Sequence, residues 1–266
     1  MLNILQEIAE RTMQRVAEAK KEITPAEMKK RAESCRANVD FPFEAALKKK
    51  GLSFICEVKK ASPSKGIIVE DFPYIQIAET YERAGADALS VLTEPYYFKG
   101  SNDYLREIRE HSWLPILRKD FTVDEYMIYE AKVLGADAVL FICAILTDAQ
   151  LAAYVQLAKS LGMSALVEAH DSVEVERALA CKASIIGVNN RNLKDFSVDI
   201  ENSVRLRKMV PEDIIFVSES GIKTPQDVQA LMENGTDAVL IGETLMRSGN
   251  VQETLAQMRK GKDDAG

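Results

Sequence analysis

The sequence predicts a TIM barrel, the (βα)8 class of α/β fold, with an extra N-terminal helical extension. From Leu52 onward, eight short apolar segments alternate with segments of helical periodicity, which is typical of parallel strands joined by right-handed crossovers. A Gly-(Ala/Thr)-Asp-Ala unit also recurs, and its glycines at Gly85, Gly135 and Gly235 lie 50 and 100 residues apart. Because one such period spans two βα units, the repeat favours eight units closed into a barrel. A doubly wound sheet is the alternative, but no G-x-G-x-x-G motif follows the first predicted strand.

The eight predicted strands are short apolar segments, three of which open with the repeated unit. The segment at 184–188 falls where the repeat predicts a further unit, although the glycine is missing there. The predicted strands span residues 54–58, 88–92, 116–118, 138–142, 164–167, 184–188, 214–217 and 238–241.

Residues 1–50 differ from the rest because they carry helix signals and no strand signal. Apolar residues recur at helical spacing from Ile4 to Val16, which predicts a first helix with one apolar face. Thr24 followed by Pro25 predicts the N-cap and first turn of a second helix, which runs to about Cys35. We expect this arm to pack over the mouth of a barrel formed by residues 52–260, so that residues 1–266 make a single domain.

Composition excludes several classes of protein. Hydrophobic residues make up 47% and charged residues 28% of the 266 residues, which suits a soluble globule. The net charge of -7 gives no reason to expect nucleic-acid binding. Two histidines and four cysteines without a C-x-x-C pair make a metal site unexpected. No signal peptide or membrane-spanning apolar segment is visible, so we expect a reduced, cytoplasmic protein.

The segment at 54–66 is the first candidate for part of a functional site. An apolar strand turns charged at Glu57 and Lys59 and then breaks into the turn Ser62-Pro63-Ser64. Polar residues at the C-terminal ends of barrel strands build the active site, because the βα loops lie there. The alternative is a strand end that simply meets solvent.

Lys119 and Glu168 end the third and fifth predicted strands. Each precedes by three residues a predicted helix N-cap, Thr122 or Asp171, so both side chains should face the mouth of the barrel. A partly desolvated Lys near other cations can have its pKa lowered toward neutrality, and a desolvated Glu can have its pKa raised. This pair therefore suits proton transfer, and the alternative is a structural ion pair across the rim.

The ends of the seventh and eighth strands suggest a phosphate site. Ser220-Gly221 and Gly242-Glu243 follow these strands, whose loops commonly bind phosphate through backbone N–H groups and a short extra helix. An ordinary tight turn is the alternative, and Glu243 is a mild objection. Aromatic residues such as Phe98 and Phe121 also fall in loops at the mouth, where they would suit a flat apolar substrate portion or simply pack the loops.

Five segments together resemble the indole-3-glycerol phosphate synthase family. The resemblance covers nearly the whole chain, including the arm, and the motifs occur in the family's order and spacing. They lie at residues 57–66 (EVKKASPSKG), 117–121 (LRKDF), 166–170 (LVEAH), 187–193 (GVNNRNL) and 218–222 (SESGI).

The resemblance implies a lyase of tryptophan biosynthesis that needs no cofactor or metal. Its substrate is 1-(2-carboxyphenylamino)-1-deoxyribulose 5-phosphate, and its products are indole-3-glycerol phosphate, carbon dioxide and water. The general acid of ring closure falls on Lys119 and the base of the later dehydration on Glu168. The strand-1 pair falls on Glu57 and Lys59; Lys59 binds substrate anions, and its share of the acid role stays open.

The remaining family contacts with the substrate fall on three groups of residues. These are holders of polar groups (Asn189, Arg191), residues packed on the anthranilate ring (Phe98, Phe121, Leu193) and the phosphate loops (Ser220, Gly221, Gly242, Glu243). Because the seventh and eighth strands supply the phosphate site, we expect the turn at Ser62 and Pro63 to form a wall for the aromatic acid. Glu243 departs from members with a small hydroxyl residue there, which puts one phosphate hydrogen bond in doubt. We expect a monomer that binds no nucleic acid or membrane, and association with other tryptophan-pathway enzymes stays open.

Two other functions remain as alternatives. Another phosphosugar barrel, such as an isomerase of the same pathway, would need only an acid and a base on neighbouring carbons and has no use for several rim cations. A catalytically silent barrel would be a binding or scaffolding subunit. That alternative predicts loss of the polar rim, whereas Lys59, Lys119 and Arg191 are all present.

Overall fold

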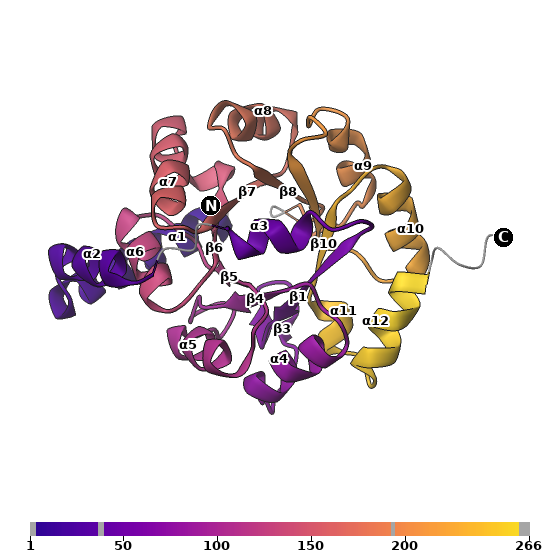
Figure 1. Cartoon of the computed structure of the whole chain (residues 1–266), viewed down its shortest axis with the longest axis horizontal. Helices are drawn as coiled ribbons and strands as arrows, with labels where there is room; N and C mark the ends of the chain where they lie inside the picture. The colour runs from indigo at the N-terminus through magenta and orange to yellow at the C-terminus, as the bar shows by residue number, and fades with distance from the viewer. Residues whose placement is uncertain (1–3, 37–39, 193–194, 261–266) are drawn as a thin grey trace.

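The computed structural model describes residues 4–36, 40–192 and 195–260 and confirms the predicted TIM barrel (Figure 1). Eight parallel strands close on themselves in the order β1-β10-β9-β8-β7-β6-β5-β4. The strands are β1 (Ser53–Val58), β4 (Ala88–Leu92), β5 (Ile116–Lys119), β6 (Ala138–Ile142), β7 (Ser164–Ala169), β8 (Ile185–Asn189), β9 (Ile215–Glu219) and β10 (Ala238–Ile241). A separate antiparallel pair, β2 (Ala61–Ser62) with β3 (Gly66–Ile67), follows β1.

Helices surround the barrel and bury its outer face. The ring consists of α4 (Tyr74–Arg83), α5 (Asn102–His111), α6 (Glu125–Val133), α7 (Asp148–Ser160), α8 (Ser172–Ala180), α9 (Glu201–Arg207), α10 (Pro225–Glu233) and α12 (Val251–Lys260). Two single turns, η1 (Cys143–Ile145) and α11 (Glu243–Met246), precede α7 and α12. No helix in the described part of the chain is long and apolar enough to cross a membrane.

The N-terminal arm forms three helices, α1 (Ile4–Glu22), α2 (Pro25–Ser34) and α3 (Pro42–Leu47). The predicted start of α2 is confirmed, because Thr24 Oγ1 accepts a hydrogen bond from the backbone N–H of Glu27 at 3.3 Å. The chain then ends α2 at Cys35, as predicted, and α2 packs against α6. Helix α3 was not predicted.

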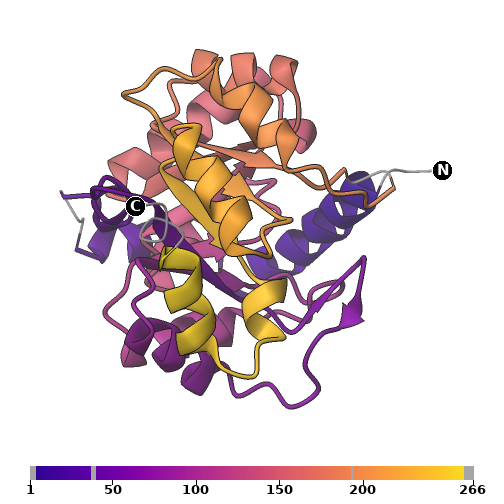
Figure 2. The same cartoon turned by 90° about the vertical axis from the view of Figure 1, so that its right-hand side faces the viewer.

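Helices α3 and α1 lie at opposite ends of the barrel. Figure 1 looks along the barrel onto α3, whose Phe43 and Leu47 are fully buried among residues at the starts of the strands. Figure 2, turned by 90°, shows α1 at the other end of the barrel, the end that also carries the β2–β3 pair. There Leu5 and Ile8 join the inner core next to Phe121. The arm therefore closes one end of the inner core and forms part of the wall at the other.

The repeated Gly-x-Asp unit ties neighbouring strands together at the α3 end. Each Asp accepts a hydrogen bond from a backbone N–H at the start of the adjacent strand, which fixes the register between them. The pairs are Asp87 with Phe54 (2.9 Å), Asp137 with Ile116 (3.0 Å) and Asp237 with Phe216 (2.8 Å). The sequence repeat thus reports a repeated structural contact and not a repeated functional one.

The glycines of the same units end helices in the left-handed conformation. Gly85, Gly135 and Gly235 have φ of 87°, 88° and 80°. Lys182 occupies the corresponding place before β8 with φ of 60°, so the same turn forms there without a glycine. A side chain in this conformation costs about 1–2 kcal/mol, so this turn is strained.

The predicted N-cap at Asp171 is confirmed, and the one at Thr122 is not. Thr147 and Thr224 form capping boxes, and Asp171 accepts from the backbone N–H of Glu174 at 2.9 Å. The prediction for Thr122 is wrong, because α6 is capped by Asp124, whose carboxylate accepts from the N–H of Tyr126. The loop after β5 is therefore longer than predicted.

Candidate active site

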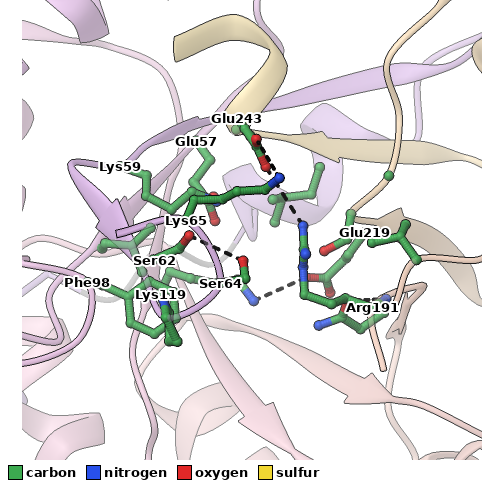
Figure 3. Close-up of a pocket in the computed structure, with 18 of the residues that line it drawn as sticks. Glu57, Lys59, Ser62, Ser64, Lys65, Phe98, Lys119, Arg191, Glu219 and Glu243 are labelled. Atoms are coloured by element: carbon green, nitrogen blue, oxygen red, sulfur yellow. Dashed lines mark hydrogen bonds and ion pairs between the residues drawn. The ribbon is translucent and has the colours of Figure 1, made fainter. Parts of the chain in front are cut away.

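A pocket of about 480 Å³ opens at the C-terminal ends of the strands. It brings together every candidate site residue except Leu193, which lies outside the described residues. Figure 3 labels several of them, such as Glu57, Lys119 and Arg191. The candidates that line it are Glu57, Lys59, Ser62, Pro63, Phe98, Lys119, Phe121, Glu168, Asn189, Arg191, Ser220, Gly221, Gly242 and Glu243.

Lys119 is the centre of the polar half of the pocket. Strand alternation points Arg118 outward, where it donates to the backbone oxygen of Met127, and points Lys119 inward. The Lys119 Nζ lies 2.9 Å from Glu168 Oε2 and 3.1 Å from Glu219 Oε2. In the part of the chain that the structure describes, no group of three or more His, Cys, Asp or Glu side chains could hold a metal ion. The carboxylates converge instead on an ammonium.

The pKa of Lys119 moves in the direction opposite to the one expected. Burial acts to lower this pKa, but the carboxylates of Glu168, Glu219 and Glu57 outweigh it and raise the pKa above its ordinary value. The expectation was wrong because it placed Lys119 among cations, whereas its nearest charged neighbours are acids. Lys119 is therefore held as a cation in the free protein.

The pKa of Glu168 is lowered where a raised value was expected, and Glu219 is the buried Glu whose pKa is raised. Burial acts to raise the pKa of Glu168, but Lys119 and His170 lower it to about 2. Burial raises the pKa of Glu219 to about 7, and the charge of Glu168 adds to the effect although Lys119 opposes it. Of the two carboxylates that contact the Lys119 ammonium, Glu168 is thus firmly ionised, whereas Glu219 titrates near neutrality.

Glu219 is a functional candidate that the sequence patterns did not indicate. It is 1% exposed, and its Oε1 has no hydrogen-bond partner within the described residues. A Cβ added to Gly187 on the adjacent strand would collide with this oxygen, so Gly187 makes room for the carboxylate. The available signal was an acidic residue that ends β9 beside the predicted phosphate loop, in Ser218-Glu219-Ser220.

Glu57 and Lys59 form an ion pair at the end of β1. Both are largely buried, with side chains 5% and 16% exposed. Gly242 packs directly on Glu57, because a Cβ there would meet the Glu57 carboxylate. Its φ of -121° is open to any residue, so the need for glycine at this position comes from close packing. Glycines on β8 and after β10 therefore each accommodate a buried carboxylate.

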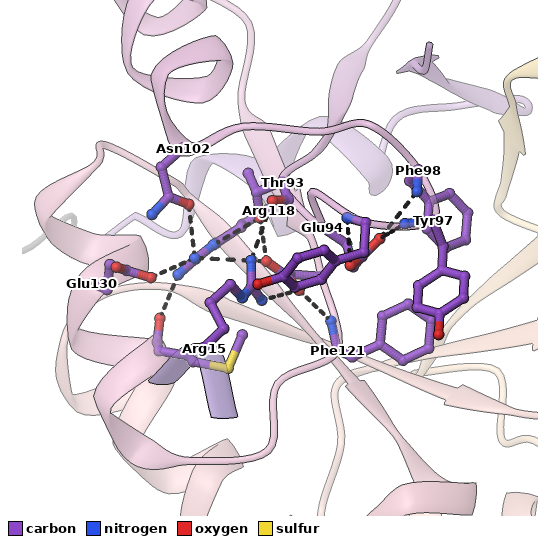
Figure 4. A network of polar contacts seen from close by, with 12 residues as sticks. Arg15, Thr93, Glu94, Tyr97, Phe98, Asn102, Arg118, Phe121 and Glu130 are labelled. Carbon is purple, nitrogen blue, oxygen red and sulfur yellow. Dashed lines mark hydrogen bonds and ion pairs between the residues drawn. The ribbon is translucent and has the colours of Figure 1, made fainter. Parts of the chain in front are cut away.

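The opposite wall of the pocket is apolar and partly aromatic. The rings of Phe98 and Phe121 lie 6.0 Å apart between centroids, and Leu5 and Ile8 of the arm line the same space. The loop that carries Phe98 is fixed by the buried carboxylate of Glu94, which accepts from three successive backbone N–H groups (Figure 4). This wall offers a surface for a flat apolar ring.

Asp120 links the arm to the strand that carries Lys119. Its buried carboxylate accepts from Arg15 at 2.7 Å, from Thr93 Oγ1 at 2.6 Å and from the backbone N–H of Phe121 at 2.8 Å. Helix α1 is thus tied to the ends of β4 and β5. Because Asp120 adjoins both Lys119 and Phe121, this contact bears on the position of both.

The third part of the pocket is rich in cations and turns. Ser220 and Gly221 follow β9 with φ of 67° and 86°, a pair of left-handed residues that turns the chain sharply. Glu243 lies 3.7 Å from Lys65, 3.9 Å from Arg191 and 3.3 Å from Arg247. The acid that looked unfavourable in the sequence is thus surrounded by positive charge (Figure 3).

Comparisons with known proteins match nearly the whole chain to one protein family. The family model for indole-3-glycerol phosphate synthase matches residues 5–258. The chain is 56% identical to indole-3-glycerol phosphate synthase of Ruminiclostridium cellulolyticum over 96% of its own length and 98% of that protein. It is 53% identical to the synthase of Lacticaseibacillus paracasei over 97% and 99%. Orotidine 5′-phosphate decarboxylase from Pyrococcus horikoshii shares the fold alone, with a TM-score of 0.59 and 13% identity over 78% of this chain and 98% of that one.

Proposed function

This chain belongs to the indole-3-glycerol phosphate synthase family, and we propose that the cluster around Lys119 performs the reaction of that family. The protein is a carboxy-lyase of tryptophan biosynthesis that converts 1-(2-carboxyphenylamino)-1-deoxyribulose 5-phosphate to indole-3-glycerol phosphate. The alternatives of an isomerase and of a silent barrel are thereby excluded. Individual residues take their roles in this reaction from their places in the pocket.

The three parts of the pocket suit the three parts of the substrate. The apolar wall at Phe98 and Phe121 suits the anthranilate ring. The turn at Ser220-Gly221 and the start of α11 suit the phosphate, because backbone N–H groups and nearby cations bind phosphate without titrating. The sugar ketone, which lies between ring and phosphate, then comes to Lys119.

Lys119 acts as the general acid of ring closure. The ring carbon that bears the carboxylate attacks the ketone carbon, and the ketone oxygen takes a proton from the Lys119 ammonium. A raised pKa does not prevent this transfer, because an oxygen becoming an alkoxide is far more basic than an amine. The bond to the carboxylate then breaks, carbon dioxide leaves, and its electron pair restores the aromatic ring.

Glu168 acts as the base of the dehydration. The hydroxyl group takes a proton from the Lys59 ammonium and leaves as water, assisted by the lone pair of the ring nitrogen. Glu168 removes a proton from the carbon next to that nitrogen to give the indole. Its lowered pKa keeps Glu168 ionised in the free protein. Once Lys119 has given up its proton, Glu168 loses the charge that depresses its basicity, so the acid step prepares the base step.

The other polar residues hold the substrate. Lys59 is placed to pair with the ring carboxylate until carbon dioxide leaves, with Glu57 as its partner in the free protein. Asn189 donates to Glu168 Oε1 at 3.2 Å and accepts from the backbone N–H of Arg191 at 3.0 Å. Asn189 therefore orients both the base and the loop that carries Arg191, which binds the phosphate end.

The position of Lys119 between two acids is the main support for its role as the acid and for Glu168 as the base. Single-turnover kinetics test both roles. Carbon dioxide release and indole fluorescence are followed separately in Lys119→Met and Glu168→Gln. Glu168→Gln should release carbon dioxide while indole formation lags, and Lys119→Met should block both. Equal loss of both signals in Glu168→Gln would show that Glu168 acts before decarboxylation.

We further propose that the protein works as a monomer in the cytoplasm. One chain by itself brings the proposed acid, base and phosphate loops into one pocket, which supports catalysis by a monomer. All four cysteines are free, and three of them are buried, as suits a reducing compartment. Light scattering coupled to size-exclusion chromatography tests the first point, and a mass corresponding to a dimer would contradict it.

A further inference from the structure

We propose that His170 is a positioning residue that holds Glu168 in its ionised form and in a fixed orientation. The proposal rests on the assignment of Glu168 as the base and goes beyond it, because it makes the state of the base depend on a second group. His170 follows β7 by one residue and lies between Glu168 and Glu174.

The imidazole is fixed from the side of α8. Its Nδ1 lies 3.0 Å from Glu174 Oε2, and the same carboxylate oxygen accepts from the backbone N–H of His170 at 2.8 Å. The backbone oxygen of His170 accepts from Asn202 Nδ2 at 3.0 Å. Main chain and ring are therefore both held, and the ring cannot turn without losing Glu174.

The other ring nitrogen faces the base. His170 Nε2 is buried, makes no hydrogen bond within the described residues, and lies at ion-pair distance, 3.4 Å, from Glu168 Oε1. The separation is long for a hydrogen bond, so we treat the contact as one between charges. Oxygen Oε1 also accepts from Asn189, while Oε2 faces Lys119, so Glu168 is held on three sides.

Only the doubly protonated ring satisfies both neighbours. Since Glu174 is a carboxylate, Nδ1 must carry a proton to donate to it. In the neutral ring Nε2 would then present a lone pair to Glu168 Oε1, which is repulsive. The imidazolium instead presents N–H groups to both acids.

The surrounding charges favour the same state. Glu168 on β7, Glu174 on α8 and Glu219 on β9 are negative when ionised, and Lys119 on β5 is the cation beyond Glu168. Burial lowers the pKa of His170, but the acids, Glu174 first among them, raise it above its ordinary value. In the free protein Glu168 therefore lies between two cations.

This arrangement matters after Lys119 has given up its proton. Without a second cation, Glu168 would become strongly basic in a buried site and would take the nearest available proton. His170 leaves Glu168 ionised until the substrate carbon offers its proton. The imidazolium thus keeps the base available between the two chemical steps.

Nuclear magnetic resonance of the imidazole nitrogens gives the first test, because the chain has only two histidines. The other, His111, is exposed at the end of α5, so His111→Gln leaves one imidazole signal and serves as the control. In that variant His170 should carry both ring protons at pH 7, and adding Glu174→Gln should lower its midpoint by about one unit or more. A neutral His170 at pH 7 would overturn the proposal.

The pH profile of kcat gives the second test. In His170→Gln the acid limb should move up by about one to three pH units, the range for loss of an opposite charge at this distance. KM should change less than kcat, and His111→Gln should match the parent protein. His170→Asn replaces Gln if the first variant fails to fold. An unchanged limb refutes the role of His170, whereas full activity in Glu168→Gln would refute the base assignment itself.

Discussion

Replacing Lys119 with Met removes the charge on which the polar half of the site depends. The side chain is of similar length, so the pocket keeps its wall, but Glu168 and Glu219 lose a donor at 2.9 and 3.1 Å. Their side chains are only 3% and 2% exposed, so water cannot take the place of the ammonium without opening the site. The variant should therefore lose both activity and stability.

The sizes of both losses can be worked from these contacts. A positioned general acid contributes roughly 10²–10⁴-fold to a rate, so turnover should fall by about 10³-fold or more once substrate positioning is also impaired. Removing one partner of a buried ion pair costs about 3–5 kcal/mol. Here part of that cost is offset, because the orphaned Glu219 carboxylate can take up a proton.

Proton uptake makes the loss of stability depend on pH. Without Lys119, the pKa of Glu219, which burial already raises in the parent protein, rises further above its value in the unfolded chain, while His170 still holds Glu168 ionised. Folding then binds protons, so the variant loses stability as pH rises from about 4, the unfolded value, to the raised folded value. The deficit relative to the parent protein should thus be larger at pH 8 than at pH 5.

Two assays check this prediction. Indole fluorescence measures turnover, and urea unfolding at pH 5, 6, 7 and 8 measures the free energy of unfolding. Adding Glu219→Gln to Lys119→Met should restore part of the stability at pH 8 and none of the activity. Turnover within about tenfold of the parent, below the range for a general acid, would refute the role of Lys119. A deficit independent of pH would refute the charge argument.

Three further predictions concern the arm, the phosphate end and the barrel. Arg15→Met should lower kcat about tenfold, because it frees the loop beside Lys119. Lys20→Met breaks a more exposed ion pair from the same helix to Asp124 and should leave kcat unchanged. Equal kcat in both variants would show that the arm only packs against the barrel. Glu243→Gln should strengthen inhibition by inorganic phosphate about tenfold, or 1.4 kcal/mol, because it removes a negative charge from the phosphate end of the pocket. Weaker inhibition would mean that Glu243 holds Lys65 and Arg191 in place to bind the phosphate. Lys182→Gly should raise the free energy of unfolding by about 0.5–1 kcal/mol, since relief of the left-handed strain exceeds the entropy cost of glycine, and a lower urea midpoint would contradict this.

The fold and the residues that line the pocket could be predicted from the sequence, because both depend on local patterns. Apolar segments separated by helical periodicity located all eight barrel strands close to their observed bounds. The ends of parallel strands must meet at one face, so Glu57, Lys119, Glu168 and Asn189 could be brought together without coordinates.

The electrostatics could not be read in the same way, because they depend on which charges become neighbours. The sequence shows Lys119 next to Arg118, yet strand alternation sends Arg118 outward and leaves Lys119 among acids. Glu219 looked like part of a phosphate loop, although its side chain points to Lys119 instead. Helix α3 was missed because its six residues give too short a pattern to detect.

A crystal structure of Glu168→Gln with bound substrate tests the central assignment most directly. The roles assigned here predict the ketone oxygen within hydrogen-bond distance of Lys119 Nζ, the anthranilate ring against Phe98 and Phe121, and the phosphate at Ser220-Gly221. A ketone oxygen bound to Lys59 instead, with Lys119 still paired to Glu219, would contradict the assignment of Lys119 as the acid.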